Sequence, residues 1–147
     1  MAGHASDPNF EARVRASFLK QGLMRHLGVE VVHVAPGEVD LAVAFRPELS
    51  QQHGFFHAGV TSAIADSAAG YAALTLFGAG TGVLTTEFKI NLLNPAKGGR
   101  LVAEGRVLKA GRTLSVCRSD VFALDGDKRK QIATALLTMM QVSGVAD

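Results

Sequence analysis

One segment, residues 58–77, constrains the fold of this 147-residue chain more than any other. Its sequence, AGVTSAIADSAAGYAALTLF, is apolar or small on nearly every side and predicts a single helix. At about 1.5 Å per residue this helix would be roughly 30 Å long, which is the width of a small domain. A helix that is apolar all round is a buried helix, so we expect the rest of the chain to surround it.

Asp66 lies near the middle of this helix and is the only Asp, Glu, Lys or Arg between Glu48 and Glu87. A carboxylate inside a buried helix costs free energy unless it is hydrogen-bonded, paired or facing a cleft. The residues by themselves therefore leave two interpretations of Asp66 open. Asp66 is either a structural group bonded to Ser62 or Ser67, or a functional group in a cleft.

The composition predicts one globular domain in a reducing compartment. A net charge of +2 does not indicate wholesale nucleic-acid binding, and the single Cys117 excludes an intrachain disulfide. We expect Cys117 to be inert, because it lies in a predicted strand with no base in view. The first residues contain no apolar core segment of a signal peptide, and the central helix is only weakly hydrophobic. The prediction is a soluble, cytoplasmic protein.

Period-two alternation predicts strands on both sides of the central helix. Before it we expect short helices over residues 9–20 and 21–27, then a hairpin of strands 29–34 and 39–45 around Pro36-Gly37. After it we expect strands over residues 84–92, 100–109, 112–124 and 131–141, with Asp125-Gly126-Asp127 as a hairpin turn. The last strand is apolar on both faces, so it should lie centrally in the sheet with both faces covered.

Only an antiparallel sheet that curls around the helix can bury it on several sides, which predicts an α+β fold. A chain of this length can hardly cover the outer face of such a sheet as well. We therefore expect a dimer.

The pattern Gln51-Gln52-His53-Gly54-Phe55-Phe56-His57-Ala58-Gly59, with Asp66 nine residues after His57, resembles the hotdog-fold acyl-CoA thioesterases of the PaaI-like group. Residues 85–96, TTEFKINLLNPA, resemble the strand that follows the helix in that family. The resemblance covers roughly residues 22–141. It implies a hotdog fold, an antiparallel sheet wrapped around one long central helix, with residues 1–27 as an N-terminal tail with short helices and residues 28–147 as a single hotdog domain.

The resemblance further implies hydrolysis of acyl-CoA to free acid and CoA, without cofactor or metal, at a site formed in a homodimer, with dimers pairing into a homotetramer. In the related enzymes the helix carboxylate comes from the partner subunit, so Asp66 of one chain should face His57 of the other. Asp66 would act as general base on water, or as nucleophile through an anhydride. The N–H of Ala58 or Gly59 would bond the oxyanion, because a helix N-terminus offers unpaired N–H groups.

Gln51 would orient the water or the thioester, His57 would hold the loop and contact the thioester region, and Thr85 would position the water. The family has Gly where this chain has Ala58, and Ala would be strained if that position needs a positive φ. The resemblance implies a second set of residues for binding the substrate and CoA, namely Phe56, Asn91, Arg106, Lys109, Gly111 and Arg112.

Several alternatives remain. The chain could be a non-catalytic acyl-CoA-binding hotdog protein, although a sensor needs no base, or a hotdog acyl-CoA dehydratase or hydratase. His57 could simply cap the helix. His53 and His57 suggest no metal site, since no third ligand accompanies them. Ser62 or Ser67 lacks the G-x-S-x-G motif of a serine hydrolase.

Overall fold

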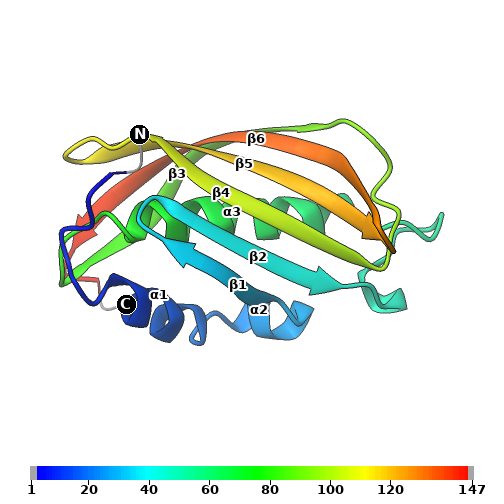
Figure 1. Ribbon diagram of the computed structural model, residues 1–147, viewed down its shortest axis with the longest axis horizontal. Coiled ribbons are helices and arrows are strands. Elements are labelled where there is room, and N and C mark those ends of the chain that lie inside the picture. Colours follow the sequence, from blue (N-terminus) through cyan, green and yellow to red (C-terminus); the bar gives the residue numbers. More distant parts are fainter. Residues whose placement is uncertain (1–2, 146–147) are drawn as a thin grey trace.

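The computed structural model describes residues 3–145, and in this part of the chain six strands surround one long helix (Figure 1). The predicted order of two strands, a long helix and four strands is confirmed. The elements before the long helix are α1 (Phe10–Phe18), α2 (Gly22–Leu27), β1 (Glu30–Ala35), β2 (Glu38–Ala44) and the 3-10 helix η1 (Pro47–Leu49). The long helix and the strands after it are α3 (Ala58–Leu74), β3 (Thr81–Leu92), β4 (Arg100–Lys109), β5 (Leu114–Asp125) and β6 (Lys128–Ser143).

The strands form one antiparallel sheet in the order β1-β2-β4-β5-β6-β3. The sheet curves over α3, which is the predicted hotdog arrangement (Figure 1). Both predicted hairpin turns are confirmed. Gly37 with φ 79° joins β1 to β2, and Gly126 with φ 58° joins β5 to β6. Glycine adopts these left-handed conformations without steric cost.

The helix lies unusually close to the sheet at Gly105 of β4. A Cβ atom at Gly105 would come within 2.3 Å of the carbonyl oxygen of Ala68. Small residues on α3 and this glycine on β4 therefore let the two backbones approach closely. Around this contact Ile64, Leu101 and Leu137 are fully buried, so the core lies between the inner face of the sheet and α3.

The expectation that α3 is buried on every side is wrong for its first half. From residue 68 to residue 77 the chain is buried all round. Before that, one stripe of the helix remains partly or fully exposed, with Asp66 within it. We call it the open stripe, and it consists of Ala58, Gly59, Ser62, Ala63, Asp66 and Ser67.

The sheet also leaves apolar surface uncovered. The last strand, β6, is paired on both sides as predicted, but its outer face is not covered, since Leu136 is 54% exposed. Within the described part of the chain, the edge strand β3 pairs only with β6. Phe88 of β3 pairs with the buried Leu137 and so lies on the inner face of the sheet, yet it is 49% exposed. An aromatic side chain that faces the helix layer but remains exposed indicates a gap in the core of a single chain.

The N-terminal segment is anchored to the C-terminal end of α3. Residues 3–8 have no helix or strand, but Asp7 is buried and its carboxylate pairs with Arg13 at 3.3 Å. Arg13 in turn donates hydrogen bonds to the carbonyl oxygens of Leu74, Phe77 and Gly78. These bonds hold α1 against the C-terminal end of α3 and the residues that follow it. Whether residue 27 marks a domain boundary stays a prediction. Between residues 3 and 145, no helix has both the length and the hydropathy needed to cross a bilayer.

Candidate active site

His57 is the N-cap of α3, and its side chain closes the first turn. Its Nδ1 accepts a hydrogen bond of 2.7 Å from the N–H of Gly59. A Cβ atom at Gly59 would lie 2.9 Å from the same Nδ1, so glycine makes room for the ring. Because Nδ1 accepts, the neutral ring carries its proton on Nε2 and presents a donor there. The capping interpretation of His57 is therefore correct, and it leaves one ring nitrogen for another partner.

The N–H of Ala58 is the free donor of this first helical turn. The N–H groups of Gly59 and Val60 bond to Nδ1 and the carbonyl oxygen of His57, respectively. Among residues 3–145 no acceptor bonds the N–H of Ala58. No residue other than glycine has positive φ in this range, so Ala58 replaces the family's glycine without backbone strain. Of the two predicted oxyanion donors, Ala58 is the one that the structure leaves available.

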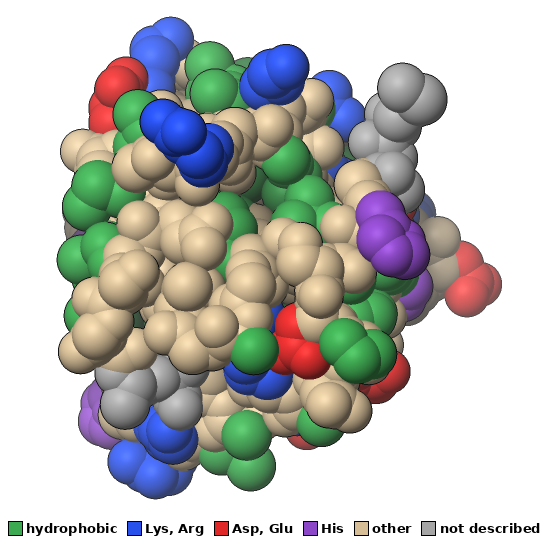
Figure 2. All heavy atoms as spheres, turned by 90° about the vertical axis from the view of Figure 1, so that its left-hand side faces the viewer, with side chains coloured by type: hydrophobic (Ala, Val, Ile, Leu, Met, Phe, Trp, Pro, Cys, Tyr) green, Lys and Arg blue, Asp and Glu red, His purple; other side chains and the backbone are tan. Residues whose placement is uncertain are grey.

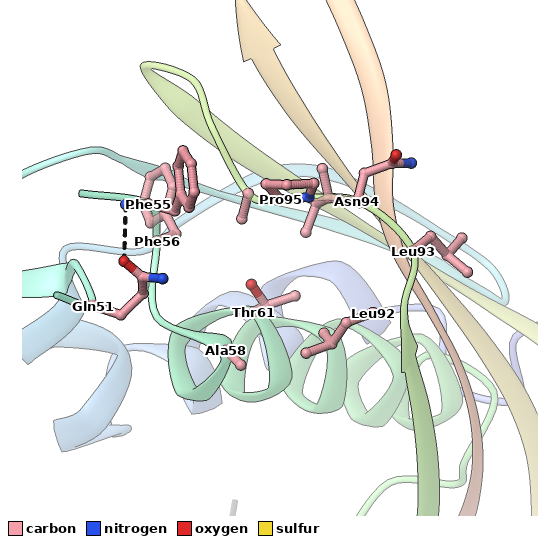
Figure 3. A pocket seen from close by; sticks show the side chains of 11 residues that line it. Gln51, Phe55, Phe56, Ala58, Thr61, Leu92, Leu93, Asn94 and Pro95 are labelled. Atoms are coloured by element: carbon pink, nitrogen blue, oxygen red, sulfur yellow. Dashed lines mark hydrogen bonds between the residues drawn. The ribbon is translucent and has the colours of Figure 1, made fainter. Parts of the chain in front are cut away.

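Gln51 is held by the loop that precedes α3. Its Oε1 accepts hydrogen bonds from the N–H groups of His53 at 2.5 Å and Phe55 at 3.3 Å. The carbonyl end of the amide is thus bound to backbone, and the Nε2 donor points into a cavity (Figure 3). The side chain therefore offers its surroundings a hydrogen-bond donor.

That cavity has a volume of about 380 Å³ and lies beside the N-terminus of α3. Gln51, Phe56 and Ala58 line it, together with Leu92 and Leu93 at the end of β3. Phe56 is 3% exposed and packs edge-on against Phe45. We call this space the Gln51 cavity.

Thr61 adds a polar group to the Gln51 cavity that the sequence analysis missed. Its side chain is 1% exposed and its Oγ1 has no hydrogen-bond partner among the described residues. Figure 3 shows this hydroxyl on the cavity side of α3. The signal that could have found it is its position three residues after Ala58, on the same flank of the helix. A buried hydroxyl without a partner costs free energy, which a ligand in the cavity would recover.

Asp66 lies on the open stripe and is held by β3. The Thr85 hydroxyl donates a 2.7 Å hydrogen bond to Oδ1 of Asp66, and Oδ2 has no partner among residues 3–145. The register of β3 against β6 shifts between Thr85 and Glu87, which makes a β-bulge. The bulge lets Thr85, opposite the buried Met139, face the helix.

Asp66 and Thr85 line a second cavity, of about 360 Å³, which we call the Asp66 cavity. Helix α1 and the residues after it close this cavity with Ser17, Lys20 and Gln21. Gln21 accepts a hydrogen bond of 3.2 Å from Ser67 of α3. The walls of the Asp66 cavity are thus more polar than those of the Gln51 cavity.

One chain does not bring the predicted catalytic residues together. Gln51 and Ala58 line the first cavity, Asp66 and Thr85 the second, and His57 and Gly59 a third of about 350 Å³. Nine residues along α3 separate His57 from Asp66. This separation is about 13.5 Å along the axis and about half a turn around it. The two side chains therefore cannot reach one carbonyl carbon within the same chain.

Of the residues predicted to bind the substrate and CoA, Phe56 lines the Gln51 cavity. Asn91, Arg106 and Lys109 lie on strands and line none of these three cavities. Asn91 pairs with Thr134 near the end of β3 and is exposed. Arg106 on β4 bonds Asp40 and lies 3.8 Å from Glu38. Burial alone would lower the pKa of Arg106, but the hydrogen bond and charge of Asp40, with Glu38 and Glu104, raise that pKa. Its charge is thus neutralised by carboxylates of its own chain.

Lys109 ends β4, and Gly111 and Arg112 belong to the connection between β4 and β5. A Cβ atom at Gly111 would lie 2.2 Å from the carbonyl oxygen of Leu114, so the tightness of this turn explains the glycine. The connection lies at the end of the molecule that faces the viewer in Figure 2, where Lys and Arg side chains gather along the upper margin. Their role in binding stays a prediction. Burial raises the pKa of the Cys117 thiol to about 12, so this thiol stays protonated at neutral pH.

Comparisons with known proteins agree with this architecture. The family model of the thioesterase superfamily matches residues 53–130. A protein of Saccharolobus solfataricus, provisionally named an esterase, is 32% identical over 104 residues, which are 71% of this chain and 74% of that protein.

Solved structures show the same fold. A thioesterase family protein from Silicibacter pomeroyi is 42% identical and has a TM-score of 0.90 over 92% of this chain and 99% of that one. The PaaI protein of Escherichia coli, from its phenylacetic acid degradation operon, is 18% identical, with a TM-score of 0.83 over 93% of this chain and 96% of that one. At this lower identity the likeness concerns the fold alone.

Proposed function

The chain belongs to the thioesterase superfamily, with a PaaI-like hotdog fold, and we propose that it hydrolyses acyl-CoA thioesters to the free acid and CoA. The observation that carries this proposal is the pair of unused donors at the start of α3. Among the described residues the N–H of Ala58 has no acceptor, and Nε2 of Gln51 points into the cavity that Ala58 lines. Two free donors that line one cavity suit the oxygen of a thioester carbonyl, which becomes an oxyanion during hydrolysis. The unpartnered hydroxyl of Thr61 also favours a ligand in this cavity.

The carboxylate for this reaction would come from a second copy of the chain. Asp66 is too far along α3 to reach a carbonyl bound at Ala58 of its own chain. The open stripe around Asp66 and the exposed Phe88 of β3 leave a surface that a second chain would cover. In such a dimer Asp66 of each chain would face His57 and Ala58 of the other. Two equivalent sites would result, as expected for a symmetric dimer.

In the proposed reaction the carbonyl oxygen accepts hydrogen bonds from Ala58 and Gln51, which draw electrons from the carbonyl carbon. Oδ2 of Asp66 is free to take a proton from water, while Thr85 holds Oδ1. The water oxygen bonds to the carbon, the carbon–sulfur bond then breaks, and the proton passes to the departing sulfur. Attack by Oδ2 itself, through an anhydride that water then cleaves, would use the same free oxygen.

The experiment that tests this function is thiol release from short, medium, long and aromatic acyl-CoAs, with Asp66→Asn as the variant. Asparagine keeps an oxygen that accepts from Thr85 but removes the base. We expect kcat to fall about 10² to 10⁴-fold while CoA binding, measured by calorimetry, is retained. No thiol release from any acyl-CoA by the unaltered protein, with CoA still bound, would instead favour a non-catalytic acyl-CoA-binding protein.

A further inference from the structure

A basic cleft adjoins the Gln51 cavity, next to the hairpin that joins β5 to β6. It has a volume of about 340 Å³ and shares Phe55 and Pro95 with the Gln51 cavity. Its basic side chains come from two places, Lys97 after β3 and Lys128 and Lys130 at the start of β6. We call it the lysine cleft, and Ala123 and Asp125 complete its lining.

The two lysines of β6 lie on the inner face of the sheet. In the register of β5 against β6, Lys130 lies opposite Ala123, which is 3% exposed, and Lys128 lies opposite Asp125. Residues directly opposite on neighbouring strands share a face, and residues two apart along a strand do so too. Both lysine side chains therefore lie on the inner face of the sheet, where Phe55 and Pro95 also line the cleft.

The charges of these lysines are not neutralised by ion pairs. Among residues 3–145, no carboxylate lies within ion-pairing distance of Lys97, Lys128 or Lys130. With three lysines and Asp125, the lining carries a net charge of 3 − 1 = +2.

The arginines on the outer face of the sheet differ in this respect. Arg106, Arg118 and Arg129 each pair with a carboxylate of this chain. Arg129 also lies 3.7 Å from the centre of the Phe122 ring. The lysine cleft thus concentrates positive charge without ion pairs next to the Gln51 cavity, which the proposed oxyanion donors line.

We propose that the lysine cleft binds the phosphate groups of the nucleotide part of CoA. This inference rests on the proposed function and names the part of the substrate that the cleft would hold. The thioester would lie at Ala58 in the Gln51 cavity, and the pantetheine arm would pass Phe55 and Pro95, which both spaces share. Phosphates would then meet three ammonium groups, and the half-buried ring of Phe55 offers a surface on which adenine can stack.

The test compares the triple variant Lys97→Gln/Lys128→Gln/Lys130→Gln with the unaltered protein on two substrates that carry the same acyl group. One is the acyl-CoA and the other is the acyl-pantetheine, which has no nucleotide. The matched control is Lys89→Gln, which removes one exposed lysine of β3. A second variant, Lys109→Gln/Arg112→Gln, tests the connection between β4 and β5 as the rival phosphate site.

We expect the triple variant to raise KM for acyl-CoA about tenfold, with kcat and the KM for acyl-pantetheine nearly unchanged. The expected rise in KM is no larger because each exposed charge pair contributes little free energy. A KM for acyl-CoA that does not rise, or that rises equally for acyl-pantetheine, would overturn the proposal. A rise that occurs instead in the variant of Lys109 and Arg112 would also overturn it. If Lys89→Gln raised KM for acyl-CoA equally, the effect would come from net charge, and the proposal would likewise be overturned.

Direct binding of adenosine 3′,5′-bisphosphate by calorimetry separates this inference from the proposed function. If the unaltered protein hydrolyses no thioester but binds the bisphosphate about tenfold more tightly than the triple variant does, the cleft is supported and the hydrolase is not. If hydrolysis occurs but both proteins bind the bisphosphate equally, the function stands and the cleft assignment fails.

Discussion

Thr85 of β3 donates a 2.7 Å hydrogen bond to Asp66 of α3, across 19 residues of sequence. The bond joins the edge strand of the sheet to the central helix at the one charged residue of that helix. It depends on a β-bulge, because the register of β3 shifts directly after Thr85. Bulges often redirect a side chain next to a functional site. The half-buried carboxylate of Asp66 is thus oriented by the hydroxyl of the exposed Thr85, which occupies one of its two oxygens.

The first prediction concerns this hydrogen bond. Thr85→Val keeps the shape of the side chain but removes the donor, so Asp66 should lose its fixed orientation. We expect kcat to fall about tenfold with little change in KM, since only the carboxylate is affected. Thr85→Ser restores the hydroxyl and should recover most of the rate. Steady-state kinetics of the three proteins would check this, and a Ser variant as slow as the Val variant would contradict it.

Gln51 leads to a second prediction, through a nearly isosteric change. In Gln51→Glu one carboxylate oxygen can still accept from the N–H groups of His53 and Phe55, while the other replaces the Nε2 donor. A negative charge would then face the developing oxyanion. We expect kcat to fall about 10² to 10³-fold, as for the loss of an oxyanion donor elsewhere. Unchanged thermal unfolding would exclude misfolding as the cause, and an unchanged kcat would remove Gln51 from the oxyanion site.

A third prediction follows from the separation of Ala58 and Asp66 along α3. If each site takes Asp66 from one chain and Gln51 from the other, a heterodimer of Asp66→Asn and Gln51→Glu chains contains one intact site. Random pairing makes about half of the dimers heterodimers, so about a quarter of all sites should be active. The measurement is thiol release by the two variants co-expressed with different affinity tags, with each variant expressed alone as the control. Activity no higher than that of the single variants would indicate a site contained in one chain.

A fourth prediction concerns stability at Gly105. An added Cβ atom would come within 2.3 Å of the Ala68 carbonyl oxygen, and backbone cannot yield as a flexible side chain does. We expect Gly105→Ala to lower the free energy of unfolding by about 1–3 kcal/mol, the range for overpacked cores. The control is Gly99→Ala, because a Cβ atom there would meet no atom within 4 Å. Urea unfolding of both variants would check this, and equal midpoints for the two would contradict it.

Residues 51–66 show how much of the site the sequence could predict. The resemblance carried by Gln51, His57 and Asp66 indicated the chemistry, and the apolar and small residues of α3 indicated a buried helix. The hydrogen bonds between the predicted residues were not predictable in this way. Gly59 was an equal candidate for the oxyanion donor, yet its N–H bonds Nδ1 of His57. Arg106 was a candidate for phosphate binding, yet Asp40 and Glu38 neutralise its charge.

The sequence by itself determined the order and kind of the elements, because hydrophobic periodicity, Pro36-Gly37 and Asp125-Gly126-Asp127 act on their local neighbours. Tertiary structure decided which groups remain free to act. The pairing of β3 with β6 and its bulge bring Thr85 to Asp66, and the antiparallel pairing of β5 with β6 brings Lys130 opposite Ala123, on the face shared with Phe55. These relationships join residues far apart in the chain, and strand register sets them. A register shift of one residue turns every side chain of a strand to the other face, so no local pattern specifies such contacts.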